Sequence, residues 1–95
     1  MGRNYLGKVR SSLAHYKFKF LSKISNLEII ARGKAVRIRN YLNRKYGQGR
    51  KRRWRKLKGT ALIEYSDGRI VNAEIHFFED QDVGQFKFKA IRDLE

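Results

Sequence analysis

Glu74 and His76 are the residues of this sequence whose types and spacing could do acid–base chemistry. They stand two positions apart in NAEIHFFED, residues 72–80, and a spacing of two places both side chains on one face of a β-strand. A carboxylate can accept a proton, and a histidine can hold one near neutral pH. Lys87 and Lys89 show the same alternation in QFKFKAI. If the two strands pair, all four side chains share one face of a sheet.

These four residue types suffice to cleave RNA without a metal ion. Glu74 would take the proton of the 2′-hydroxyl, His76 would protonate the leaving oxygen, and Lys87 and Lys89 would bind the phosphate. No cofactor and no metal is predicted, because the acidic turn EDQD, residues 79–82, matches no standard calcium loop. The alternative is an ordinary exposed sheet face, on which each cross-strand pair contributes about 0.2–1 kcal/mol.

Charge divides the chain into two unequal parts. The 95 residues carry a net charge of +14, but residues 1–59 hold 19 Lys and Arg against one Glu, whereas residues 60–95 hold 4 Lys and Arg against 8 Asp and Glu. A basic region of this size attracts polyanions, of which nucleic acid is the commonest. An anionic membrane surface or an acidic protein partner is the alternative.

The densest basic run is QGRKRRWRKLKG, residues 48–59. Trp54 at its centre has two interpretations: it stacks on an RNA base while the neighbouring cations contact phosphates, or it packs at the edge of the sheet beside a solvated loop. The residues predicted to bind nucleic acid are Arg37, Arg39, Arg50, Lys51, Arg52, Arg53, Trp54, Arg55, Lys56 and Lys58.

The first half of the chain shows apolar residues at spacings of three and four, which predict helices over about residues 4–23 and 26–46. Ser25 and Asn26 are suitable N-cap residues for the second helix, and Gly47 is placed to end it. Two alternatives stay open. YKFKF, residues 16–20, also alternates with period two and could be extended, and Gly33 could mark a break.

Period-two alternation takes over after residue 59 and predicts an antiparallel sheet. A two-residue turn at Asp67 and Gly68 would bring a glutamate onto the apolar face. A three-residue turn, 66–68, instead aligns Ile63 with Val71 and keeps the apolar residues together. A further strand would place Phe86, Phe88 and Ala90 on the core side.

The predicted fold is therefore α+β, with two N-terminal helices packed on one face of a three- to four-stranded antiparallel sheet. Residues 1–95 would form one domain, helical over 1–47, a basic loop over 48–58 and sheet over 59–95. The sequence has no apolar run long enough to cross a bilayer and no signal-peptide pattern. These features favour a cytoplasmic location.

Two family resemblances follow from these patterns. Residues 59–93 resemble a segment of small bacterial proteins of poorly defined role, through the A-E-x-H pattern of Ala73, Glu74 and His76 followed by two aromatics, Glu79 and Val83-Gly84. Helices followed by an antiparallel sheet on a short basic chain also resemble the toxin ribonucleases grouped with barnase, the tRNA-cutting colicins and the RelE-type toxins. This second resemblance is one of architecture and charge and transfers no catalytic residue.

The expected function is a metal-independent endoribonuclease, a bacterial toxin acting on tRNA or ribosomal RNA. RNA is the expected partner, DNA is possible, and a toxin would also have an acidic antitoxin or immunity protein. The alternative is a non-enzymatic RNA- or DNA-binding module.

Overall fold

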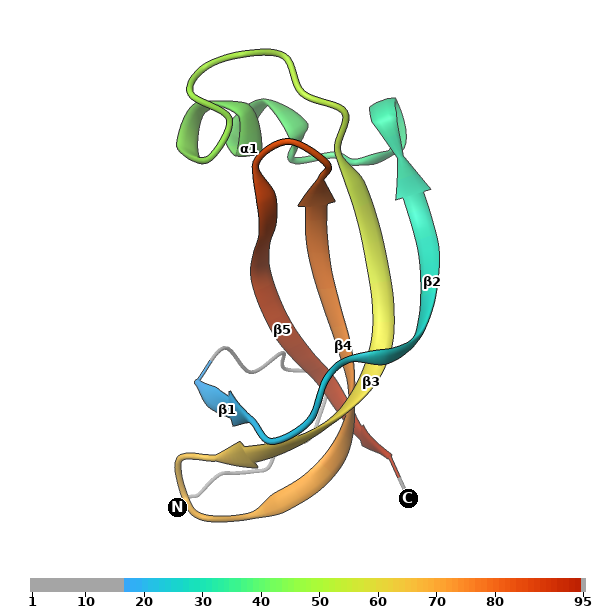
Figure 1. The fold of residues 1–95 in the computed structure, drawn as a ribbon, viewed down its shortest axis with the longest axis vertical. Coiled ribbons are helices and arrows are strands. Elements are labelled where there is room, and N and C mark those ends of the chain that lie inside the picture. The colour runs from blue at the N-terminus through green and yellow to red at the C-terminus, as the bar shows by residue number, and fades with distance from the viewer. Residues whose placement is uncertain (1–16, 95) are drawn as a thin grey trace.

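The computed structural model describes residues 17–94. It contains a five-stranded antiparallel sheet, one turn of 3₁₀-helix and one α-helix (Figure 1). The elements in chain order are β1 (Phe18–Phe20), β2 (Ser25–Arg32), the 3₁₀-helix Gly33–Ala35, α1 (Arg39–Lys45), β3 (Arg55–Tyr65), β4 (Ile70–Asp80) and β5 (Gly84–Leu94). Within the described residues, no helix is both long enough and apolar enough to cross a membrane.

Strand β3 organises the sheet. It pairs with β4 along one edge, and its other edge pairs with β2 over Arg55–Thr60 and with β1 over Ile63–Tyr65. Strand β5 adds to the free edge of β4. The three long strands, β3 to β5, each span 11 residues and form the curved body of the molecule (Figure 1).

The predicted pair of N-terminal helices is wrong. Of the segment predicted as helix 26–46, residues 26–32 belong to the strand β2, and only the seven residues of α1 are α-helical. The apolar residues at helical spacing were misleading, because Leu27 and Ile30 are exposed whereas Ile29 and Ala31 contact the core. Residues 29 and 31 follow the period of a strand, and pairing with β3 stabilises that conformation.

The other predicted boundaries of this region had mixed outcomes. Ser25 and Asn26 begin a strand and cap no helix. Gly33 does mark a break, since with a φ of +53° it follows the last residue of β2. α1 stops at Lys45, two residues before Gly47, but Gly47 is not among the glycines with positive φ and so does not end the helix as a left-handed cap. Of the predicted helix 4–23, residues 4–16 lie outside the described part, and Phe18–Phe20 is extended, as the alternation in YKFKF allowed.

The β3–β4 hairpin has the predicted register. Ile63 lies opposite Val71 and Ala61 opposite Ala73, so the turn is the three-residue segment 66–68. Gly68 has a φ of +92°, a conformation that glycine adopts without a steric penalty. The hydrophobic pattern therefore specified this pairing, because a shift of one residue would have turned the apolar side chains outward.

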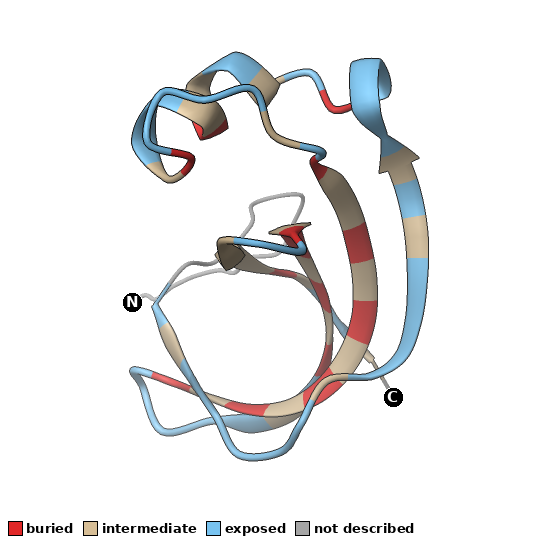
Figure 2. Ribbon diagram, turned by 45° about the horizontal axis from the view of Figure 1, so that its top comes forward, coloured by how far each residue is buried: buried red, intermediate tan, exposed pale blue. Residues whose placement is uncertain are grey.

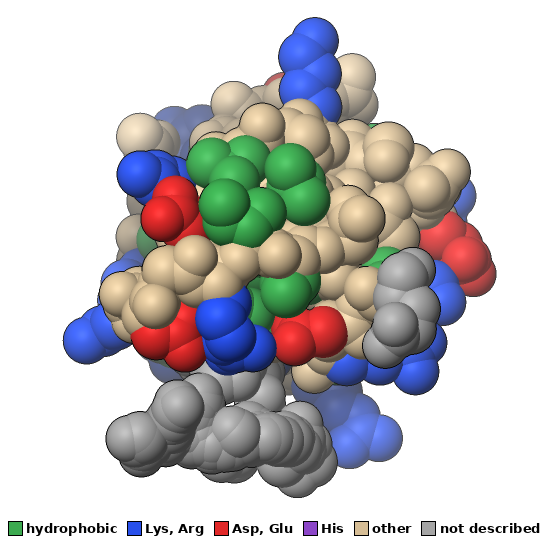
Figure 3. Space-filling model, turned by 90° about the horizontal axis from the view of Figure 1, so that it is seen from below, with side chains coloured by type: hydrophobic (Ala, Val, Ile, Leu, Met, Phe, Trp, Pro, Cys, Tyr) green, Lys and Arg blue, Asp and Glu red, His purple; other side chains and the backbone are tan. Residues whose placement is uncertain are grey.

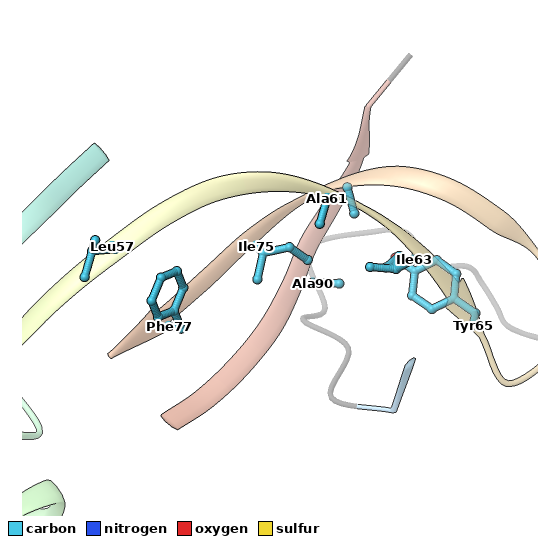
Figure 4. Close-up of a cluster of buried hydrophobic side chains, with 8 residues drawn as sticks. Leu57, Ala61, Ile63, Tyr65, Ile75, Phe77 and Ala90 are labelled. Carbon is cyan, nitrogen blue, oxygen red and sulfur yellow. The ribbon is translucent and has the colours of Figure 1, made fainter. Parts of the chain in front are cut away.

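The main core lies on the concave side of the curled sheet and not under helices. Figure 4 shows Leu57, Ile63, Ile75 and Phe77 on this side of β3 and β4, and Figure 2 shows the alternation of buried and half-buried residues along β3. Phe20 near the β1 edge meets Phe88 of β5 in an edge-to-face contact at 5.5 Å between ring centroids. The curled sheet itself therefore encloses the core that two helices were predicted to cover.

Gly59 allows the chain to cross closely over β3. A Cβ at this position would lie 2.5 Å from Cγ2 of Ile24 and 2.7 Å from the carbonyl oxygen of Ser25. Both distances are shorter than van der Waals contact, so a larger residue would displace the start of β2. The glycine that begins the period-two pattern is needed for packing between strands.

A second core cluster fills the end of the sheet where α1 lies (Figure 1). Its buried members are Val36, Leu42, Trp54 and Phe78. A helix of seven residues is too short to be stable alone, and the burial of Leu42, which is 0 % exposed, holds it against the sheet. Arg44 and Lys45 stand in its last turn, where positive charge suits the helix dipole.

The prediction that Phe86, Phe88 and Ala90 of β5 all face one core is wrong. A bulge interrupts the pairing of β5 with β4 between His76 and Phe78, and Lys87 within it has a φ of +58°. Phe86 therefore packs with the second cluster, whereas Phe88 packs with the first. An irregularity of this kind changes which face each later side chain occupies.

Asp80 fastens the basic loop to the β4–β5 turn. Its carboxylate is buried, 4 % exposed, and accepts hydrogen bonds from the backbone N–H groups of Arg53, Asp82 and Val83 at 2.9–3.2 Å. Burial alone would raise the pKa of Asp80, but these three donors and the charge of Arg52 outweigh it and lower the pKa below 3.8. The carboxylate is thus ionised and structural.

Replacing Asp80 by asparagine is expected to destabilise the fold by about 2–3 kcal/mol at pH 7, because buried donors lose a charged acceptor. A carboxyl group whose folded pKa is depressed stabilises fully above its ordinary pKa, and this contribution is lost as pH falls through the folded value. Urea unfolding at pH 7 and pH 2.5 should therefore show a larger difference between wild type and variant at pH 7. Asp82→Asn, at an exposed residue of the same turn, is the control, and an equal loss in both variants would contradict the assignment.

Candidate nucleic-acid interface and acid–base pair

Two rows of polar side chains cross the central strands on one face of the sheet. Lys58, His76 and Lys89 are paired across β3, β4 and β5. Thr60, Glu74 and Arg92 form the next row along the strands. Directly paired residues project to the same side of a sheet, so His76 lies between two lysines and Glu74 lies beside an arginine. This face is opposite the one that carries Ile75 and Phe77.

Glu74 and His76 form a hydrogen-bonded pair. Nε2 of His76 lies 2.6 Å from Oε2 of Glu74, and both side chains are largely buried, 16 % and 14 % exposed. Arg92 donates from Nε to the other carboxylate oxygen at 2.9 Å. The hydrogen bond from His76 is the main cause that lowers the pKa of Glu74, and Arg92 adds to it against the opposing effect of burial.

This geometry changes the predicted roles. An ionised carboxylate accepts hydrogen bonds only, so Nε2 of His76 carries the hydrogen and Nδ1 is the nitrogen able to accept a proton. Glu74 has both oxygens engaged and a lowered pKa, which makes it a weak base. Its position suits it to orient the imidazole ring, and His76 is the better candidate for the base.

Lys87 does not lie beside Glu74 and His76, as predicted for a phosphate-binding residue of the candidate catalytic group. The bulge turns it away from the row of His76, and its Nζ lies over the ring of Tyr41, 5.3 Å from the centroid. Lys89 is retained because it pairs with His76. The cause is local: the positive φ of Lys87 breaks the alternation from which the two lysines were placed together.

Arg92, which sequence reasoning missed, reaches Glu74 because a second irregularity in β5 places it opposite. No sequence signal marks that irregularity. Lys56 also lies on this face, opposite Phe78, whose ring its Nζ approaches to 5.6 Å from the centroid. Burial and the nearby charge of Lys89 lower the pKa of Lys56, so lysines of β3 and β5, the strands on either side of β4, lie within electrostatic reach of each other.

Cationic side chains are concentrated at the α1 end of the molecule. Residues 32–58 include thirteen Lys and Arg and no Asp or Glu, and they form the 3₁₀-helix, α1, the loop that follows and the adjoining parts of β2 and β3 at the top of Figure 1. We call this region the basic end. The opposite end, seen from below in Figure 3, mixes carboxylates with Lys and Arg around a group of hydrophobic side chains. There Arg69 pairs with Asp67 and Asp93.

Apart from Lys56 and Trp54, the residues predicted to bind nucleic acid fall into two groups. Several are engaged by the protein: Arg39 with the carbonyls of Lys34 and Val36, Arg52 with that of Gly47, Arg55 with Glu79 and Lys58 with Glu28. The side chains of the other group are exposed and make no hydrogen bond or ion pair with any residue from 17 to 94. They are Arg37, Arg50, Lys51 and Arg53.

Trp54 is not available to bind nucleic acid. Its side chain is buried, 1 % exposed, in the second cluster, and its indole N–H donates to Oδ1 of Asn43 at 2.8 Å. No ring face is open for stacking on a base. Of the two interpretations, packing at the end of the sheet is the correct one, and Trp54 anchors the basic loop.

Over residues 17–94, no group of three or more His, Asp and Glu side chains is arranged to hold a metal ion. Comparison of the chain with protein-family models, with curated protein sequences and with solved structures gave no match. The resemblances noted from the sequence therefore gain no support from these comparisons, and we infer the function from the residues themselves.

Proposed function

We propose that the protein binds RNA through its basic end. The observation that supports this proposal is the cluster of thirteen Lys and Arg, with no Asp or Glu among them, from residue 32 to residue 58, gathered at one end of a molecule 41 Å long. Phosphate contacts by Lys and Arg supply most of the affinity of proteins that bind nucleic acid without sequence preference. The exposed cations of the basic end whose side chains make no hydrogen bond or ion pair with the described residues are Arg32, Lys34, Arg37, Arg44, Arg50, Lys51 and Arg53.

Two features favour RNA over duplex DNA. The one α-helix of the described part has only seven residues and is followed directly by the basic loop, so it is poorly suited to lie along a major groove. The acid–base pair beside the basic end is also of the type that acts on a 2′-hydroxyl, which DNA lacks. An affinity for duplex DNA equal to that for RNA would contradict this preference.

The test is fluorescence anisotropy with a labelled single-stranded oligoribonucleotide. The double variant Arg37→Gln/Arg44→Gln removes two charges from exposed side chains of the basic end. We expect it to bind about tenfold more weakly than the wild type. The matched double variant Lys17→Gln/Lys23→Gln removes the same charge from exposed residues near β1 and should lose less than about threefold. Equal losses would mean that net charge alone, and no particular surface, governs binding.

A second candidate function is metal-independent cleavage of the bound RNA. It is favoured by the hydrogen bond of 2.6 Å between Glu74 and His76 and by the lysines on both sides of His76. His76 would accept the proton of the 2′-hydroxyl through Nδ1 as the 2′-oxygen attacks phosphorus, and would return it to the leaving 5′-oxygen. Lys58 and Lys89 would stabilise the charge on the phosphate oxygens. If this activity is toxic to its host, an acidic inhibitor would have the basic end as its natural docking surface.

A further inference from the structure

A cleft opens at the basic end where three parts of the chain meet. The last residue of β2, the segment 51–55 that leads into β3, and residues 80–82 of the β4–β5 turn surround a space of about 690 Å³. Sites for small molecules commonly have volumes of about 300–1,000 Å³. The cleft is therefore large enough for a nucleotide, and neither His76 nor Glu74 is among its lining residues.

Three cations of the cleft are available to a ligand. Arg32, Lys51 and Arg53 line it, are exposed, and have side chains without a hydrogen bond or ion pair to the described residues. The other cations of the lining are already engaged, since Arg52 donates to the carbonyl of Gly47 and Arg55 pairs with Glu79. The cleft thus holds more positive charge than the protein neutralises.

The carboxylates of the cleft do not cancel that charge. Asp80 accepts three backbone hydrogen bonds and lies near Arg52, so its charge is compensated within the protein. Asp82 is the remaining acidic residue of the lining, and it stands against the three available cations. The balance favours an anion with more than one negative charge.

A terminal phosphate has the required chemistry. A phosphomonoester carries a charge of about −1.5 to −2 at pH 7 and three acceptor oxygens, whereas an internal phosphodiester carries one charge. Arginine side chains bind such a group through two parallel hydrogen bonds. We propose that this cleft binds a phosphomonoester, carried by the end of an RNA chain or by a free nucleotide. This inference rests on the proposed RNA binding and specifies the chemical group that is bound.

The experiment compares oligoribonucleotides of one sequence that carry a 5′-phosphate, a 3′-phosphate or hydroxyl groups at both ends. We expect the wild type to bind one phosphorylated form at least about tenfold more tightly than the hydroxyl form. Arg32→Gln/Arg53→Gln should reduce this preference to within about twofold. Arg37→Gln/Arg44→Gln, which removes equal charge outside the cleft, should bind every form more weakly but keep the preference. Thermal unfolding checks that the variants are folded.

The outcomes separate this inference from the proposed function. RNA binding without a preference for a phosphorylated end would overturn the inference and leave RNA binding standing, as would a preference lost equally in both double variants. Calorimetry with AMP and adenosine distinguishes the sources of the phosphate. Binding of AMP that requires Arg32 and Arg53, in a protein that binds no RNA, would support the cleft and overturn the proposed RNA binding. Binding of phosphorylated RNA but not AMP would identify the chain end as the ligand.

Discussion

Replacing His76 by alanine is expected to reduce cleavage of RNA in EDTA by at least about a hundredfold, the scale of a lost general base or acid. The same variant should bind RNA within about twofold of the wild type, because the cations of the basic end stay in place. The physical reason is the position of His76, held by Glu74 at 2.6 Å and paired with Lys58 and Lys89 in the neighbouring strands. Gel analysis of RNA fragments, with end mapping, measures the first effect and anisotropy measures the second.

Glu74→Gln tests the orienting role. An amide offers one acceptor oxygen where the carboxylate uses two, one for His76 and one for Arg92. Cleavage should therefore fall by about ten- to a hundredfold while affinity for RNA is unchanged or slightly increased. Asn72→Ala, an exposed residue of the same strand face, is the control and should behave as the wild type. Unimpaired cleavage by His76→Ala would remove this site from the reaction. A wild type that binds RNA without cutting it would leave the binding function alone.

Affinity for single-stranded RNA is expected to fall by about a thousandfold or more when the salt concentration rises tenfold. Each neutralised phosphate contributes about −0.7 to the slope of log affinity against log salt for single strands. We expect five or more phosphate contacts from the available cations of the basic end. The slope is obtained from anisotropy titrations at several salt concentrations.

The charge variants make this prediction specific. Arg37→Gln/Arg44→Gln should reduce the magnitude of the slope by about 1.4, because two phosphate contacts are lost. Lys17→Gln/Lys23→Gln should leave the slope unchanged. A flat salt dependence in the wild type would contradict binding through the phosphate backbone and would point to a different partner for the basic end.

Much of the sheet could be read from the residues alone. The register of β3 and β4 follows from two apolar patterns of period two and a turn whose length has to keep them on one face. The same pattern places Glu74 and His76 together on the opposite face, and the structure shows them in contact. These features are local, since they depend on neighbours along one hairpin.

The errors arose where local pattern is ambiguous. Residues 24–32 satisfy a helical spacing and a strand spacing at once, and pairing with β3, a partner some thirty residues away, decides between them. The bulge at Lys87 is another case, because no local pattern marks it, although it places Phe86 and Phe88 in two different clusters. Trp54 stood among seven Lys and Arg between residues 50 and 58, yet its burial depends on Leu42 and Phe78 from other elements.

The sequence by itself determined the charge division, the β3–β4 hairpin and the pairing of Glu74 with His76, because composition and period-two alternation are properties of short stretches of chain. Only the tertiary structure decided that the first core is enclosed by a curled sheet, that Lys87 leaves the site while Arg92 enters it, and that Arg32, Lys51 and Arg53 line one cleft. Those results depend on contacts between segments distant in sequence. Their free energies outweigh the weak local preferences that sequence patterns report.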